Sequence, residues 1–285
     1  MPRAVAQAVR DAGVRVDPRV LYAWFRLSGD GQRIKAGSYE LERGITPRRL
    51  LDKLTRGQES YRAVTLVEGW NWRQVRAALA KADQLRPDAA KLSDADLMNL
   101  LGRPGVAPEG RFFPDTYAYS KGSSDVKVLQ RALRAMDKRV EQAWAARSPQ
   151  SVLKTPDELL TLASIVEKET GKAADRTLIA AVFQNRLRIG MPLQTDPTVI
   201  YGLGESFDGN LRRVHLQTDS PYNTYLRPGL PPTPIAMPGK ASLLAAVQPA
   251  PSKAVYFVAR GDGSSHFSES LDEHNRAVNK FQRRQ

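Results

Sequence analysis

The chain has 285 residues, 41% hydrophobic and 26% charged, which suits one large folded domain with a smaller one rather than a disordered chain. It contains no cysteine, so disulfides, a thiol nucleophile and thiolate metal sites are excluded. Its three histidines show no metal-binding spacing, and no nucleotide-binding or esterase motif occurs, so we predict no metal and no cofactor.

The formal net charge of +13 calls for an anionic partner. Basic and acidic residues interleave without a basic block or a nucleic-acid-binding signature, so we predict work near an anionic polymer or membrane surface and no nucleic acid. No run of about 18 apolar residues is present, nor is a signal peptide. The opening RAVAQAVRDAG is typical of the middle of a folded helix. We therefore expect that natural sequence upstream has been removed and that it held an anchor.

The first residues predict a small unit. An opening helix is followed by a second that starts at Pro18, IKAGSYEL (34–41) alternates like a strand, and Thr46-Pro47 caps a third helix. A strand-like stretch at 61–69 then leads into the rest of the chain. The predicted domains are residues 1–60 and 61–285.

Residues 70–148 are predicted to be mostly helical, with an interruption at the motif EGRFFPDTY (109–117). Its proline and aspartate predict a loop or turn. Its aromatic residues need somewhere to pack, and two interpretations stay open: core packing or the lining of a saccharide cleft. These residues are Phe112, Phe113 and Tyr117.

The best-defined helix starts at Thr155 as N-cap, with a capping box to Glu158, and we expect Gly171 to end it. A spacing of 100° per residue predicts one buried stripe, formed by Leu159, Leu162, Ala163 and Val166.

Two glutamates, Glu167 and Glu169, lie on the two flanks of that stripe, while Lys168 points away. A carboxyl group in the last turn of a helix beside apolar neighbours has its pKa raised by burial and by the helix C-terminus. That is the property a general acid for glycosidic bond cleavage needs. Glu169 fits slightly better, but the pattern leaves both open, as it does a structural pairing of either with Arg176 or Arg186.

A second helix is expected over about 175–189, followed by an irregular stretch at 191–204 and a stiff proline-rich loop at 222–239. The end predicts a strand at 254–260, a turn at 261–267 and a final helix at 269–282. Together these elements predict an α+β fold. Asp196 is the obvious candidate for a second carboxylate, with a turn-forming role as the alternative.

Several long words together resemble the endolytic murein transglycosylase (YceG-like) family: ASIVEKET, VFQNRLRIGMPLQTDPTVIYGLG, SPYNTYLRPGLPPTPIAMPG and YFVARGDGSSHFSESLDEHNRAV. EGRFFPDTY and LVEGW are similar to further family words, and KAGSYEL to its N-terminal LysM-like region. The likeness covers nearly the whole chain.

The resemblance implies a lytic transglycosylase that cuts nascent peptidoglycan strands internally and leaves 1,6-anhydro-muramic acid ends. It implies Glu169, the second glutamate of E-K-E-T, as the catalytic residue. It further implies a protein of the inner membrane with one transmembrane helix and a periplasmic body, peptidoglycan strands as substrate and peptidoglycan synthases as partners. Substrate-orienting residues are expected in two words, at Gln194, Thr195, Asp196 and Thr198 and at Tyr222, Asn223, Thr224 and Tyr225.

Two rival functions remain open. One is a non-catalytic peptidoglycan-binding module in which Glu169 is a structural residue. The other is a hydrolase that uses Glu169 and Asp196 as a pair of carboxylates.

Overall fold

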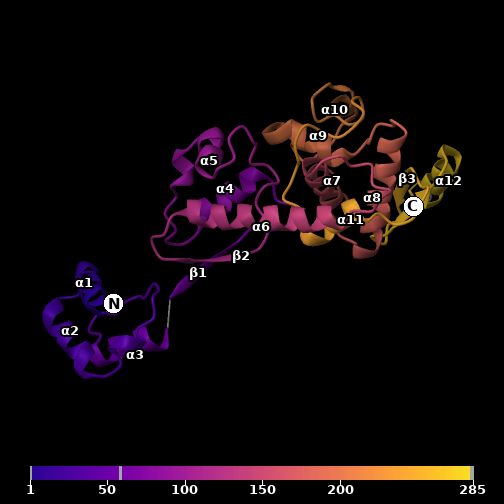
Figure 1. Ribbon diagram of the computed structural model, residues 1–285. Coiled ribbons are helices and arrows are strands. Elements are labelled where there is room, and N and C mark those ends of the chain that lie inside the picture. Colours follow the sequence, from indigo (N-terminus) through magenta and orange to yellow (C-terminus); the bar gives the residue numbers. More distant parts are fainter. Residues whose placement is uncertain (1, 58–59, 283–285) are drawn as a thin grey trace. The chain divides into compact units, whose positions relative to one another are not determined.

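The computed structural model describes residues 2–57 and 60–282. The chain divides into two compact units (Figure 1), each considered by itself below. The smaller unit is Met1–Ala63 together with two short later segments, and the larger unit holds the remaining residues. The later segments of the smaller unit are Asp83–Arg86 and Ala118–Ser123.

Three helices enclose the core of the smaller unit. The second begins where the Asp17 carboxylate accepts a hydrogen bond from the Arg19 N–H at 2.7 Å. The third begins where Thr46 Oγ1 accepts one from the Arg49 N–H at 3.3 Å. Each cap precedes a proline in the first helical turn, so both helix starts are confirmed. The helices are α1 (Pro2–Asp11), α2 (Pro18–Leu27) and α3 (Pro47–Arg56), with a 3-10 turn η1 (Gly31–Arg33).

The strand predicted at residues 34–41 is wrong, because this segment is irregular. A strand needs an extended neighbour to complete its ladder of hydrogen bonds, whereas the Lys35 N–H bonds to the Leu54 carbonyl oxygen at the end of α3, at 3.1 Å. Tyr39 and Leu41 pack against the helical core, which accounts for the alternating pattern. A LysM-like arrangement is therefore not shown in this unit.

The strand predicted at 61–69 forms but is shorter. It comprises β1 (Tyr61–Thr65), which pairs with β2 (Thr116–Ser120) in a two-stranded sheet. The hydroxyl groups of Thr65 and Thr116 lie 2.8 Å apart across it. Beyond the strand, Gly69 has a φ of 77°, a left-handed conformation that glycine tolerates and that a strand does not continue through.

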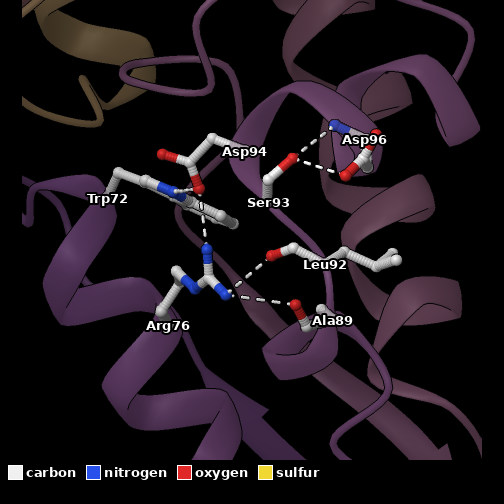
Figure 2. Close-up of polar contacts among 7 residues, drawn as sticks. All are labelled: Trp72, Arg76, Ala89, Leu92, Ser93, Asp94 and Asp96. Atoms are coloured by element: carbon white, nitrogen blue, oxygen red, sulfur yellow. Dashed lines mark hydrogen bonds and ion pairs between the residues drawn. The ribbon is translucent and has the colours of Figure 1, made fainter.

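Helices α4 (Trp72–Lys81) and α5 (Asp94–Leu100) are joined by one carboxylate (Figure 2). Asp94 Oδ1 accepts hydrogen bonds from Trp72 Nε1 at 2.9 Å and from Arg76 Nη1 at 2.7 Å. The other terminal nitrogen of Arg76 donates to two backbone carbonyl oxygens just before α5, at 3.1 and 3.3 Å. The arginine thereby ties the turn before α5 to helix α4.

The aromatic residues of EGRFFPDTY pack in the core. Phe112 is fully buried and stacks on Trp72, with ring centroids 4.9 Å apart and planes at 24°. Phe113 and Tyr117 are also buried, and the Tyr117 hydroxyl donates to the Phe113 carbonyl oxygen at 2.7 Å. Of the two interpretations left open by the sequence, the structure supports core packing.

Helix α7 lies at the centre of the larger unit, where α6, α8 and α11 all pack against it. Figure 1 shows α6 as a long helix that runs from α4 and α5 to α7 and α11. The shared core holds the buried residues of all four helices. Their bounds are α6 (Asp125–Ala145), α7 (Pro156–Glu169), α8 (Ala173–Arg188) and α11 (Lys240–Val247).

The stretch 191–204, predicted to be irregular, contains a helix from Asp196 onward, so that prediction is wrong for its second half. Proline is tolerated in a first helical turn, where its missing N–H leaves no bond unmade, so the Asp-Pro pair starts a helix instead of preventing one. Residues 222–239 are irregular, as predicted. The elements between are α9 (Asp196–Leu203), η3 (Gly204–Ser206) and α10 (Arg213–Gln217).

The C-terminal part forms a hairpin followed by a helix. The predicted strand and final helix are confirmed as β3 (Tyr256–Ala259) and α12 (Leu271–Phe281). The predicted turn is partly wrong, because β4 (Ser265–Ser268) pairs antiparallel with β3, with Phe257 opposite Phe267. The serine-rich β4 has little strand propensity of its own and depends on this pairing.

The fold is mostly helical with two small sheets, so the predicted α+β class is confirmed in that coarse sense. Within residues 2–57 and 60–282, no helix has the length and apolar character needed to cross a membrane.

Candidate active site

The helix that carries both candidate carboxylates, α7, starts at the predicted cap. Thr155 Oγ1 accepts a hydrogen bond from the Glu158 N–H at 3.1 Å, and Pro156 occupies the first turn. The Glu158 carboxylate accepts from the Lys154 N–H at 2.5 Å, one residue before the N–H that a capping box uses.

The other end of α7 differs from the prediction. Glu169 is the last helical residue, Thr170 is extended with a φ of −146°, and Gly171 does not take the left-handed conformation of a glycine stop. The Thr170 hydroxyl instead accepts a hydrogen bond from the Lys172 N–H at 2.9 Å, a turn that redirects the chain without glycine.

The middle of α7 is buried on every side. The predicted stripe residues are fully buried, but so are the residues between them, because three helices surround α7. Only in the last turn do polar side chains emerge: Lys168 is exposed, and Glu167 and Glu169 are half-buried. The buried residues run without a break from 159 to 166.

Glu169 lines a cavity of about 590 Å³, called the Glu169 cavity below. Its walls come from the ends of α7 and α8, from residues 193–196, from Tyr225, and from β3 and α12. The Glu169 carboxylate accepts a hydrogen bond from Thr195 Oγ1. The Glu169 carboxyl group is thus held by a neutral donor in a space large enough for a sugar unit.

The surroundings of Glu169 favour its protonated form. Burial raises the pKa of the Glu169 carboxyl, and the nearby negative charge of Asp196 raises it further. The Thr195 hydrogen bond and the positive charge of Arg186 act in the opposite direction, but they are outweighed. A carboxyl group with a raised pKa is what proton donation to a leaving oxygen requires.

Glu167 has a different environment. Its Oε2 accepts a hydrogen bond from the Gly239 N–H at 2.9 Å, and it is not among the residues that line the Glu169 cavity. A β-carbon at Gly239 would lie 1.9 Å from Glu68 Oε1, so a side chain there would displace the Glu68 carboxylate. The structure therefore separates the two carboxylates that the helix pattern left open: Glu167 holds a loop, and Glu169 faces the cavity.

Three further predicted residues line the same cavity. Asp196 Oδ1 accepts a hydrogen bond from the Tyr225 hydroxyl at 2.6 Å. Gln194 has a φ of 49°, unusual for a residue with a side chain, and its Oε1 accepts from Arg186 Nη1 at 3.2 Å. Burial, and then Asp196, raise the pKa of Tyr225, so its phenol stays a neutral donor.

The predicted threonines form a buried network behind the cavity wall. Thr195 N–H donates to Thr224 Oγ1 at 3.2 Å, and the hydroxyl groups of Thr198 and Thr224 lie 2.8 Å apart. Thr198 also donates to the Thr195 carbonyl oxygen at 2.8 Å. Hydrogen bonds thus join the motifs QTDPT (194–198) and YNTY (222–225). The network holds the Thr195 hydroxyl that contacts Glu169.

Tyr222 and Asn223 are placed outside the Glu169 cavity. The Asn223 amide is fully buried and donates to three backbone carbonyl oxygens between residues 215 and 218. The Tyr222 hydroxyl lies 2.8 Å from Thr233 Oγ1. Both residues shape the irregular loop that presents Tyr225.

Comparison with known proteins relates this chain to a protein family. A model of the YceG-like family matches residues 2–280. The chain belongs to the YceG-like family. The resemblance predicted from the motifs is thereby confirmed.

The relatives are similar along most of the chain. An endolytic murein transglycosylase of Bacillus subtilis strain 168 is 34% identical over 98% of this chain and 81% of its own length. One of Streptococcus pneumoniae strain D39 is 30% identical over 86% of this chain, which spans only 50% of that relative. A crystal structure of a putative YceG-like protein from Listeria monocytogenes matches with a TM-score of 0.64 and 28% identity, covering 96% of this chain and 94% of that one.

Several cavity residues of this family member were not predicted. Arg186 is buried; its Nε donates to the Val255 carbonyl oxygen at 2.6 Å, and its guanidinium lies 5.3 Å from the Tyr256 ring centroid. His274 of α12 stacks on Tyr256, with ring centroids 5.1 Å apart. The sequence offered one signal, because Arg186 is already a candidate structural partner of one of the two glutamates. That α12 returns to Glu169 was not visible in any local pattern.

Proposed function

We propose that this protein is an endolytic lytic transglycosylase that cleaves peptidoglycan between N-acetylmuramic acid and N-acetylglucosamine. The observation that carries the proposal is Glu169: one carboxyl with a raised pKa, in the cavity, on the family's E-K-E-T word. The names of the relatives support the same activity. Because murein is the polymer of the cell wall, these names also support a working part of the protein that lies outside the cytoplasm.

In the proposed reaction, the protonated Glu169 gives its proton to the oxygen that links the two sugars, and the bond from that oxygen to C1 of the muramic sugar breaks. The C6 hydroxyl of the same sugar then attacks C1, and the carboxylate of Glu169 takes the hydroxyl proton. The products are a new GlcNAc hydroxyl end and a 1,6-anhydro-muramic acid end. The protons balance, and no water enters the products.

The neighbours of Glu169 suit both halves of this cycle. The Thr195 hydroxyl fixes the orientation of the carboxyl and stabilises the carboxylate once the proton has left. Arg186 supplies a positive charge near the site while its nitrogens are held by backbone carbonyl oxygens. Because Arg186 is held by these carbonyls, it stabilises the carboxylate by charge without fixing its orientation.

A hydrolase with two carboxylates is the runner-up function, because Asp196 lines the same cavity. In that mechanism Asp196 would activate water or attack C1. Against it, Asp196 accepts a hydrogen bond from Tyr225 and stands at the start of α9, a position in which it orders the cavity wall. Against a binding module without catalysis, the Glu169 carboxyl lines a cavity large enough for a sugar unit and accepts a hydrogen bond from Thr195 Oγ1 there.

Mass spectrometry of digested glycan strands distinguishes these functions. We expect anhydro-muramic ends, lighter by one water than hydrolytic ends. Asp196→Asn weakens turnover but keeps the anhydro end in whatever product forms, because the residue acts by positioning. Reducing muramic ends would favour the hydrolase, and absence of cleavage on un-crosslinked strands would favour the binding module.

The anchoring by an N-terminal transmembrane helix and the association with peptidoglycan synthases remain proposals from the family resemblance. They are testable by fractionation and by cross-linking of the full-length protein.

A further inference from the structure

A second cavity, of about 680 Å³, lies on the C-terminal hairpin and α12, and it is basic. Its cations are Arg260 at the end of β3 and Arg276 and Lys280 on α12, all exposed, with His266 of β4 beside them. Among residues 2–57 and 60–282, Glu273 is the one carboxylate in its lining. Three cations against one anion leave this basic cavity with a net positive charge.

The cations gather on an aromatic floor. The Arg260 guanidinium lies 5.7 Å and Lys280 Nζ 5.3 Å from the ring centroid of Phe281, which is half-buried. Arg260 Nη2 lies 3.3 Å from His266 Nδ1. The Glu273 carboxylate accepts the Glu269 N–H at 3.1 Å at the start of α12. These contacts hold Arg260 and Lys280 together over one ring and engage the Glu273 carboxylate.

The basic cavity and the Glu169 cavity share their walls. Along β3, Val258 and Ala259 line the Glu169 cavity and the next residue, Arg260, lines the basic one. On α12 the two cavities take alternate faces: His274 and Val278 face the first and Arg276 and Lys280 the second. A ligand held in the basic cavity is therefore separated from Glu169 by one hairpin and one helix.

We propose that the basic cavity binds the free carboxylates of the stem peptide on a strand whose glycan occupies the Glu169 cavity. The inference rests on the proposed function. In an interior stretch of peptidoglycan, the stem peptides carry the carboxylates, and each peptide branches from a muramic sugar. The fork of an arginine matches a carboxylate in two hydrogen bonds. A lipid diphosphate is also negatively charged and could bind these cations. It lies at the end of a glycan strand, however, away from a cut in the strand interior.

The test measures binding of glycan strands in a Glu169→Gln background, which removes the proposed acid and keeps strands intact. Peptide-bearing strands are compared with strands stripped of peptides by an amidase. The cavity variant is Arg276→Gln with Lys280→Gln. The matched control is Arg134→Gln with Lys138→Gln, two exposed cations with the same spacing on α6.

We expect the parent and the control to bind peptide-bearing strands more tightly than stripped strands. In the cavity variant, the ratio of these two affinities should fall by a factor of roughly three to ten. An equal loss in the control would overturn the proposal in favour of diffuse charge attraction. An unchanged preference in the cavity variant would also overturn it. Binding to vesicles of anionic lipid is measured alongside, and a loss of binding that is confined to these vesicles would overturn it as well. Cleavage of stripped strands by the unmodified protein reports on the proposed function independently.

Discussion

At the scale of single residues, Glu169 and Glu167 show how two positions on one helix turn acquire different chemistry. Glu169 faces a cavity and accepts a hydroxyl hydrogen bond from Thr195, whereas Glu167 accepts the backbone N–H of Gly239. Burial raises the pKa of Glu169. The two glutamates therefore provide their own matched comparison.

We expect Glu169→Gln to lower glycan turnover by roughly 10²-fold or more, since glutamine keeps the shape but cannot donate the proton. Glu167→Gln should keep most of the turnover, because its amide oxygen still accepts the Gly239 N–H. Turnover and thermal melting are measured for both variants. Near-normal turnover of Glu169→Gln with an unchanged melting curve would end the assignment of Glu169 as the acid.

A second residue-scale prediction concerns Glu109, which is buried and accepts the Trp72 N–H at 3.1 and 3.0 Å through its two oxygens. Burial raises the pKa of Glu109 to about 7, against an ordinary value of 4.5. The folded state therefore binds a proton that the unfolded state has lost in this window. The free energy of unfolding must then fall as pH rises from about 4.5 to about 7.

Glu109→Gln should remove this pH dependence. The free energy of unfolding changes by on the order of 1.4 kcal/mol per pH unit, and so by a few kcal/mol across the window. Urea unfolding at pH 5, 6, 7 and 8 measures it, with the exposed Glu205→Gln as control. A slope that persists in Glu109→Gln would assign the pH dependence to other groups.

At the scale of elements, α7 and the segment after it position the site. The N-cap fixes where the helix starts, and the turn at Thr170 fixes where it ends, so the last turn meets the threonine network. Helices α6, α8 and α11 pack against α7 and restrict its movement.

We expect Thr155→Ala to lower the free energy of unfolding by about 1 kcal/mol, because the Glu158 N–H loses its acceptor. Thr155→Ser should retain most of the stability, since its hydroxyl can take the same place. Urea denaturation of the three proteins decides it. Equal stability of the alanine and serine variants would show that the cap hydrogen bond contributes little.

At the scale of the whole molecule, the predicted domain boundary between residues 60 and 61 implies that the chain after it can fold by itself. The smaller unit has its own core, and domains with separate cores often fold independently. It also holds short segments from later in the chain, one of which pairs Asp83 with Arg62 at 2.7 Å. Both of these residues remain in a chain that starts at residue 61.

We therefore predict that residues 61–285 fold without the first 60 but bind polymeric glycan less well. Thermal melting and pull-down on isolated cell-wall sacculi compare the two proteins. A shorter chain that does not fold would place the boundary elsewhere, and unchanged binding would deny the first unit a role in holding glycan.

The sequence by itself determined those features that depend on near neighbours in the chain. The cap at Thr155, the proline starts of α2 and α3, and the E-K-E-T word with its family are all readable from a few adjacent residues. Their physical causes, such as hydroxyl capping and the fixed φ of proline, act over one helical turn.

Only the tertiary structure decided which partners distant segments find. Alternation at 34–41 predicted a strand, but this segment is irregular, whereas the serine-rich β4 pairs with β3. Tyr225 and Asp196 meet through the fold, as do Glu169 and the side chains of α12, 102 or more residues further along the chain. Burial creates the raised pKa of Glu169, and burial is a property of packing between elements that a local pattern does not contain.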